Sequence, residues 1–258
     1  MPPLRAYSNT HIVTNRSCLV TEPKRLDKRL VELIHCSRGD AIKYIEGGWV
    51  LVEGEVEERP QFKVLRQQVE LHADATLEPA EPITLIFNLP QDAYTDDSSE
   101  MQQLITAQNH SETDYSGIRL LKNHFSKLQD AAPLQSGASG LTVFSKDWRV
   151  IRVLNENNKK KEEEYIVDFS EEFSTEMLEQ LNDLVDNSDR SQTKFKASRQ
   201  SEKAMRIVFG FTHTEQLETL CNSVGLSIVT MKRIRIGRVS KKDLPSGQWR
   251  YLSKKTMF

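Results

Sequence analysis

Apolar residues near the start of the chain recur at the spacing of a helix. Residues at i, i+4, i+7 and i+8 form one apolar face: Leu26, Leu30, Leu33 and Ile34. A variant capping box, Ser37-x-x-Asp40, predicts the start of a second helix, which Gly47-Gly48 would end. The apolar residues that follow predict short strands near Trp49–Val52, Val56, Phe62, Val64 and Val69, with a tight turn at Glu53-Gly54.

Longer apolar runs predict further strands in the second half of the chain. We expect strands at Ile83–Phe87, Leu141–Phe144, Tyr165–Phe169, Met205–Phe209 and Leu226–Ile236. Helical spacing predicts helices at Ile118–Leu128 and Trp148–Leu154, one that begins at Ser174, and one at Thr214–Ser223. Strands and helices alternate without a regular βαβ repeat, so the predicted fold class is α+β.

The length of 258 residues suits one large core and a smaller module. We expect a flexible N-terminal arm over residues 1–23, with a short strand at Ile12-Val13, a small domain over 24–72, an acidic linker over 73–82 and a large domain over 83–258. No apolar run is long enough for a membrane span or a signal peptide, which favours a cytoplasmic protein. Three widely spaced cysteines, Cys18, Cys36 and Cys221, suggest free thiols and no metal site.

The net charge of −2 hides a strong asymmetry along the chain. Between Ala73 and Ile118 there are nine acidic residues and no lysine or arginine, whereas from Thr230 onward nine lysines and arginines face the single acid Asp243. Basic residues also outnumber acidic ones in the two predicted N-terminal helices. Such basic surfaces favour a polyanionic partner, although a solvated charge cluster has the same composition.

The N-terminal motifs resemble the small αL RNA-binding module known as the S-four domain. The resemblance covers roughly Arg25 to His72 and rests on Arg25–Leu30, Cys36-Ser37-Arg38, Ile45–Gly48 and Gly54. It implies binding to structured RNA through the two-helix face. The residues that it assigns to RNA binding are Arg25, Lys28, Arg29, Ser37, Arg38 and Lys43.

The remaining segments resemble the RsuA/RluB/RluF family of ribosomal RNA pseudouridine synthases, and RluF and RluB most of all. The matching segments are Ser139–Asp147, Glu164–Val167, Leu220–Gly225, Lys232–Ile236 and Leu244–Leu252. The resemblance implies a mixed, mainly antiparallel sheet. It also implies isomerisation of a flipped uridine without cofactor or metal.

The family's catalytic aspartate lies five residues before the glycine of a Gly-Leu pair. Here that position is Gln135, before Gly140-Leu141. A neutral amide cannot act as the nucleophile or balance a cationic sugar. Two basic positions of the family are also replaced, by Pro133 and Glu218, and its Lys-Pro-x-Gly segment becomes Leu89–Asp92. The aromatic position at Tyr165 and the apolar position at Leu217 remain.

These departures predict an RNA-binding pseudoenzyme that acts as a monomer on structured RNA, in the first place ribosomal RNA. Its family catalytic positions are Gln135, Tyr165 and Glu218. Three alternatives stay open: an active synthase with a displaced carboxylate at Asp130 or Glu218, an active enzyme in which Gln135 was introduced artificially, and a ribosome-associated protein whose acidic face binds a protein partner. An artificial Gln135 would leave Pro133 and Glu218 unexplained.

Overall fold

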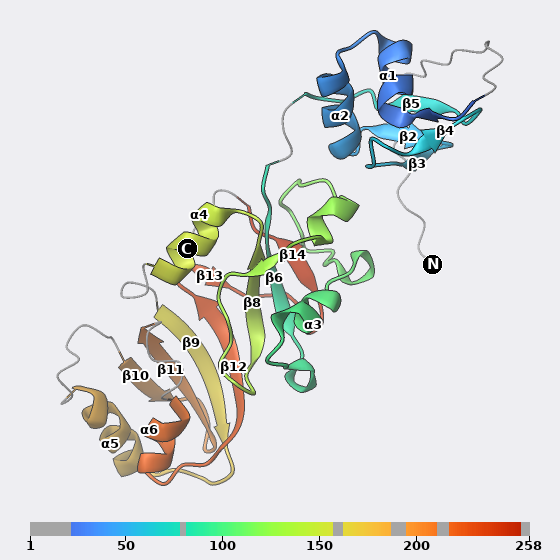
Figure 1. Cartoon of the computed structure of the whole chain (residues 1–258). Helices are drawn as coiled ribbons and strands as arrows, with labels where there is room; N and C mark the ends of the chain where they lie inside the picture. The colour runs from blue at the N-terminus through green and yellow to red at the C-terminus, as the bar shows by residue number, and fades with distance from the viewer. Residues whose placement is uncertain (1–21, 78–80, 157–161, 187–194, 211–216, 254–258) are drawn as a thin grey trace. The chain divides into compact units, whose positions relative to one another are not determined.

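The structure is a computed structural model that describes residues 22–77, 81–156, 162–186, 195–210 and 217–253. These residues form two compact units, which are drawn in Figure 1. The first unit contains the described residues up to Glu81 together with Leu120–Ser126. The second contains Pro82–Arg119 and the described residues from Lys127 onward. The expected strand at Ile12-Val13 and nearly all of the expected arm lie outside the described residues.

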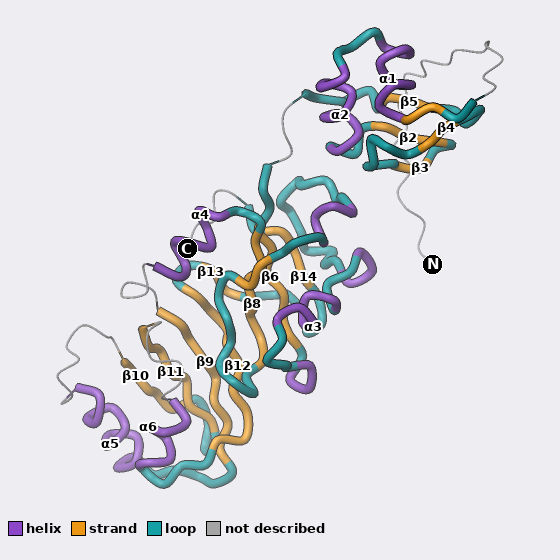
Figure 2. Tube along the Cα trace, viewed as in Figure 1, coloured by secondary structure: helices purple, strands orange, loops and turns teal. Residues whose placement is uncertain are grey.

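The first unit has two helices and short strands, as the sequence predicted (Figure 2). Its elements are β1 (Lys24–Arg25), α1 (Leu26–Ile34), α2 (Arg38–Glu46), β2 (Val50–Val52), β3 (Glu55–Val56), β4 (Lys63–Val64) and β5 (Val69–Leu71). Leu26 and Leu30 of α1 are buried against Ala41 and Ile45 of α2 in one apolar cluster. The Ser37 side chain accepts a hydrogen bond from the Asp40 N–H and so caps α2.

A segment far along the sequence belongs to this first unit. The 3₁₀ helix η3 (Lys122–Phe125) lies within it, and the Glu58 carboxylate accepts hydrogen bonds from the N–H groups of Lys122 and Asn123 at 2.7 and 2.9 Å. Leu121 is buried and lies directly against Gly48, where a Cβ atom would be 2.4 Å from the leucine side chain. The predicted helix over Ile118–Leu128 is therefore wrong. Its apolar residues are fixed by tertiary contacts around a single short turn.

The second unit is built around a nine-stranded sheet. Its strands are β6 (Thr84–Leu89), β7 (Gln129–Asp130), β8 (Ser139–Ser145), β9 (Glu162–Phe169), β10 (Phe195–Arg199), β11 (Ala204–Gly210), β12 (Ile228–Ile236), β13 (Val239–Ser240) and β14 (Trp249–Tyr251). The main path runs β10-β11-β9-β12-β8-β6-β14, with β13 beside β12 and β7 beside β8. Its pairs are antiparallel except β12 with β8, which confirms the predicted α+β fold with a mixed, mainly antiparallel sheet.

Short helices complete the second unit. They are the 3₁₀ helices η1 (Gln91–Ala93) and η2 (Ala107–Asn109) and the α-helices α3 (Ser98–Gln103), α4 (Trp148–Glu156), α5 (Thr175–Asp186) and α6 (Leu217–Ser223). Figure 1 shows α5 and α6 side by side near the start of β12, in agreement with their contacts. The central apolar cluster joins Ile86 of β6 and Val143 of β8 to Ala131 and Ala132, which precede Gln135 in the chain.

Several simple features bear on function. In the part of the chain that the structure describes, no helix is long and apolar enough to cross a bilayer. No group of three or more His, Cys, Asp or Glu side chains among these residues is arranged to hold a metal ion. Cys36 and Cys221 are free thiols, and burial raises the pKa of Cys221 to about 12. Such a thiol stays protonated and unreactive at neutral pH.

Candidate functional site

The loop that carries Gln135 runs from β7 to β8 and is firmly attached to the sheet. Ala131 and Ala132 are completely buried at its start, and Ala138 is buried at its end. The Ala138 N–H donates to the Gln135 carbonyl at 3.0 Å and closes a turn. Within this turn Ser136 and Gly137 are exposed, whereas the Gln135 side chain points inward and is only 7% exposed. The structure therefore places Gln135 inside the second unit.

Arg233 of β12 holds the loop in place. Its guanidinium is completely buried and donates to the carbonyl oxygens of Ala132 at 2.5 Å and Pro133 at 3.0 Å. Its Nε donates to the carbonyl of Leu141 in β8 at 2.7 Å. One side chain thus satisfies buried acceptors from both the loop and the sheet, which fixes the path of the chain into Gln135.

The charge of Arg233 is balanced by Glu163 of β9. Its Nη1 lies 2.7 Å from Glu163 Oε1, and neither side chain has exposed surface. Burial raises the pKa of Glu163, and Arg233 opposes that rise. The other carboxylate oxygen accepts a hydrogen bond from the Tyr165 hydroxyl at 3.0 Å. We call Arg233, Glu163 and Tyr165 the buried polar cluster.

Tyr165, which the family resemblance places at the aromatic position that contacts the flipped base, is enclosed. Its side chain has no exposed surface, and its ring stacks on Phe209 of β11 with centroids 5.4 Å apart. Burial raises the pKa of Tyr165 well above its usual value, so the hydroxyl remains a hydrogen-bond donor to Glu163. A base could reach this ring only if neighbouring groups moved.

The Gln135 amide is poorly satisfied in this environment. Its Nε2 is buried and has no hydrogen-bond partner among the described residues. An unpaired buried donor costs roughly 1–3 kcal/mol. The Gln135 amide nitrogen is thus not part of a hydrogen-bond network that takes the place of a carboxylate.

Gly140 and Leu89 define the far side of the site. Gly140 has φ of +93°, and a Cβ atom there would lie 2.3 Å from the Arg233 carbonyl oxygen, so only glycine lets β8 approach β12 so closely. Leu89 pairs with Gly140 across β6 and β8 and is buried. The basic position of the family's Lys-Pro-x-Gly segment is therefore filled by an apolar side chain in the sheet interior.

The alternative carboxylates lie elsewhere. Glu218 is exposed in the first turn of α6, whose Leu217 is buried. Asp130 in β7 is half-buried and accepts a hydrogen bond from the Ala132 N–H at 3.0 Å, and burial raises its pKa. Asp130 is thus engaged in shaping the loop. Neither residue forms a described hydrogen bond or ion pair with the Gln135 side chain.

Two of the predicted RNA-binding residues in the first unit, Arg25 and Arg38, share one buried carboxylate. Asp27 has no exposed surface and accepts hydrogen bonds from the guanidinium groups of Arg25 and Arg38 at 3.0 to 3.1 Å. Burial alone would raise the pKa of Asp27, but the two arginines and the Lys28 N–H outweigh it and lower that pKa. The side chains of Arg25 and Arg38 remain 42% and 60% exposed, so both cations are held in place at the surface.

The other four predicted RNA-binding residues differ in their surroundings. Lys28 is exposed on α1. Arg29 lies 3.7 Å from Glu32, and Lys43 lies 3.7 Å from Asp40, which are loose surface pairs. The Ser37 hydroxyl donates to the Asp40 carboxylate at 2.7 Å as part of the helix cap. We therefore interpret Ser37 mainly as a capping residue that orients α2.

Sequence reasoning missed Glu163 and Arg233 as a buried pair. The available signal was the strand alternation, since Glu163 and Tyr165 share one face of β9 and Arg233 pairs with Tyr165 in the register. The basic C-terminal segment is also less exposed than its composition suggests. Arg235 lies 2.6 Å from Glu164, which also binds Arg206.

The chain was compared with known proteins. No family model matches it. It is 26% identical over 233 residues to a protein of Aquifex aeolicus named "Uncharacterized RNA pseudouridine synthase". The match covers 89% of this chain and 92% of that protein. It is 24% identical over 238 residues to the dual-specificity RNA pseudouridine synthase RluF of Escherichia coli K12, over 89% of this chain and 75% of RluF. The Salmonella typhi RluF is 23% identical over 233 residues.

A solved pseudouridylate synthase structure aligns with a TM-score of 0.49 and 17% identity, over 90% of this chain and 96% of the other. The sequence matches to RluF and to the Aquifex protein each span both units, in line with the motifs found in each. The sequence matches make the chain a relative of RNA pseudouridine synthases, RluF among them.

Proposed function

We propose that this protein binds structured RNA, with ribosomal RNA as the first candidate, and does not isomerise uridine. The observation that carries the proposal is the state of the catalytic position. Gln135 supplies a buried, unpaired amide where the chemistry needs a carboxylate. The neighbouring carboxylate, Glu163, is enclosed and paired with Arg233, so it is not available to attack a sugar or base.

Support for RNA binding comes from the first unit. Arg25 and Arg38 share the single carboxylate of Asp27, so the group retains a net positive charge at the surface. A guanidinium held by a carboxylate at one edge keeps other N–H groups free for a phosphate oxygen. Lys28 adds a third exposed cation on the adjacent turn of α1. The proposed contacts are with phosphates and would therefore weaken as salt rises.

Pseudouridine mapping on unmodified ribosomal RNA tests the catalytic half of the proposal. The unaltered protein is expected to form no pseudouridine. Three variants run in parallel: Gln135→Asp, Gln135→Asp with Glu218→Arg, and Gln135→Asp with Glu163→Gln. The last variant is suggested by the buried cluster, because it leaves Arg233 free to pair with a new carboxylate. Pseudouridine formation by a combined variant would show that the residues changed in that variant are what prevents catalysis in the unaltered protein.

Pseudouridine formed by the unaltered protein would contradict the proposal. In that case Asp130→Asn and Glu218→Gln would identify the displaced carboxylate. The Asp130 change is the more informative of the two, because this residue lies on the strand that leads into the Gln135 loop.

A salt titration of RNA binding tests the other half. Replacing Arg38 by Gln removes one exposed phosphate contact, so the slope of log affinity against log salt should become shallower by about one. Arg66→Gln is the matched control, since Arg66 is an exposed cation in the loop between β4 and β5. Equal binding by the Arg38 variant and the control would argue against the two-helix face. Co-purification with ribosomal particles that survives nuclease would favour the protein-interaction alternative.

A further inference from the structure

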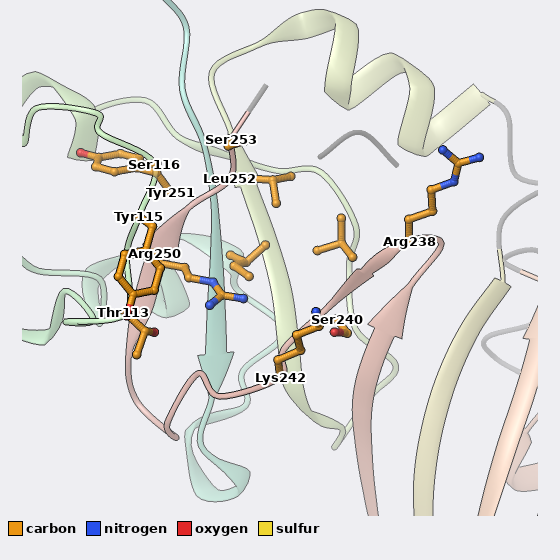
Figure 3. A pocket seen from close by; sticks show the side chains of 12 residues that line it. Thr113, Tyr115, Ser116, Arg238, Ser240, Lys242, Arg250, Tyr251, Leu252 and Ser253 are labelled. Atoms are coloured by element: carbon orange, nitrogen blue, oxygen red, sulfur yellow. The ribbon is translucent and has the colours of Figure 1, made fainter. Parts of the chain in front are cut away.

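A second basic site lies in the second unit, apart from the buried polar cluster. A cavity of about 330 Å³ is lined by the cations Arg238, Lys242 and Arg250 and by hydroxyl groups that include Thr113, Ser116 and Ser240 (Figure 3). None of its described lining residues is acidic. The cavity therefore has a positive field.

Its cations are unengaged, in contrast to others in the same C-terminal segment. Arg233 and Arg235 form ion pairs with Glu163 and Glu164 of β9. Within the described residues, the side chains of Arg238, Lys242 and Arg250 form neither an ion pair nor a hydrogen bond. A group of like charges without a counter-ion favours an anionic ligand over the empty state.

The acid inside the lining loop, Asp114, is already engaged by other groups. Asp114 stands between two lining residues, Thr113 and Tyr115. Its carboxylate already accepts from the Tyr251 N–H at 2.7 Å, from the Ser116 N–H at 2.8 Å and lies 2.7 Å from His110 Nε2. These contacts anchor the Thr113–Ser116 loop to β14, so the hydroxyl side of the cavity is held in position.

The cavity has a rigid floor and directed cations. Ile86 and Val239 line it and belong to the central apolar cluster. Arg250 of β14 and Lys242 both line this cavity, and Figure 3 shows Arg238 farther off, with its guanidinium directed away from them. Two cations from different segments therefore line one cavity, and paired cations of this kind bind phosphate groups.

The mouth of the cavity carries an exposed aromatic ring. Tyr115 is 89% exposed, the largest value among the large apolar side chains that the structure describes as exposed. Its neighbour Gly117 has φ of +71°, which shapes the exposed turn that presents the ring. An exposed tyrosine beside a cationic cavity provides the two features that bind a nucleotide. The ring stacks on the base, and the cations attract the phosphate.

We infer that this cavity binds a backbone phosphate of single-stranded RNA, with the adjacent base stacked on Tyr115. Arg250 and Lys242 contact the phosphate, and the hydroxyls of Thr113 and Ser240 supply further hydrogen bonds. The inference rests on the proposed RNA-binding function and adds a second contact region, in a different unit from the two-helix face. An RNA that combines a structured element with an unpaired strand should therefore bind more tightly than the element alone.

The test compares variants of the full chain by fluorescence anisotropy with a labelled ribosomal RNA hairpin that carries a single-stranded extension. Lys242→Gln with Arg250→Gln should weaken binding roughly tenfold at moderate salt and reduce the salt slope by about two. Tyr115→Ala should weaken it about fivefold, and Tyr115→Phe, which keeps the ring, should bind like the unaltered protein. Lys196→Gln is the control, because Lys196 is an exposed cation on β10 at the opposite edge of the same sheet.

The outcomes separate the two proposals. Weaker binding by the cavity variants only when the single-stranded extension is present supports the site. If the Arg38→Gln variant binds less tightly while the cavity variants bind normally, the cavity proposal is overturned and RNA binding by the first unit stands. If the unaltered protein binds neither RNA, the proposed function fails and this inference fails with it. Circular dichroism of each variant checks that the fold is retained.

Discussion

Two arginine–carboxylate groups in this protein use the same chemistry to opposite effect. In the first unit, Asp27 is buried while its partners Arg25 and Arg38 keep much of their surface in solvent. In the second unit, both Arg233 and Glu163 are fully enclosed. Two cations share one acid in the first group, whereas the charges are matched one to one in the second.

The difference separates an exposed cationic surface from a structural core. A buried acid that holds exposed arginines organises them without cancelling them, so they can contact a phosphate. An enclosed pair has no N–H directed to solvent and stabilises only if its hydrogen bonds are complete. Arg233 meets that condition through its contacts to Ala132, Pro133 and Leu141. The Arg233–Glu163 pair thus belongs to the interior of the second unit, whereas Arg25 and Arg38 keep exposed charge in the first.

The largest expected effect comes from breaking the enclosed pair. Glu163→Ala would leave the charge of Arg233 buried without a carboxylate, and we expect a loss of about 3–5 kcal/mol in the free energy of unfolding. Urea denaturation measures this change in the free energy of unfolding. The double variant Glu163→Ala with Arg233→Met should recover part of the loss, because the unpaired charge is gone. A single variant that loses less than about 1 kcal/mol would show that the pair is solvated and the site more open than described.

A smaller effect, with a distinct pH dependence, is expected at Asp27. The pKa of Asp27 lies below its ordinary value of 3.8 in the folded protein. Its ionised form therefore stabilises the fold above the unfolded pKa, and this contribution is lost as pH falls through the folded pKa. At neutral pH, Asp27→Asn should cost about 1–3 kcal/mol. Below the folded pKa the variant and the unaltered protein should converge.

Thermal unfolding from pH 7 to pH 2 measures this convergence. Asp40→Asn is a useful control, because the Asp40 carboxylate is more exposed, accepts a hydrogen bond from the Ser37 hydroxyl and makes only a loose pair with Lys43. A constant difference between the Asp27 variant and the unaltered protein across the range would contradict the assigned role of the carboxylate charge.

The smallest effect is expected at Gln135. Gln135→Met keeps the shape of the side chain and removes the unpaired amide, so stability should be unchanged or raised by up to about 1 kcal/mol. Gln135→Asp should lower stability, because it adds a buried charge where Arg233 is already paired. Differential scanning calorimetry of both variants is sufficient. A clear loss in the Met variant would mean that the amide has a partner in solution.

Local patterns predicted most of the first unit. The spacing of Leu26 and Leu30 placed one face of α1, and the Ser37-x-x-Asp40 cap placed the start of α2. These features depend on neighbours within a few residues, so they are visible in the sequence. The expected turn at Glu53-Gly54 is present, with φ of +53° and +81°.

The sequence also singled out Gln135, because the family resemblance sets a spacing of five residues before Gly140 within one loop. Only the tertiary structure decided three further points: that Leu120–Ser126 belongs to the first unit, that Tyr165 is enclosed, and that Glu163 pairs with Arg233. Each depends on residues about 70 positions apart meeting across the fold, as with Leu121 and Gly48 or Arg233 and Glu163. Local propensity holds no information on such contacts, since they follow from which surfaces the whole chain can bury together.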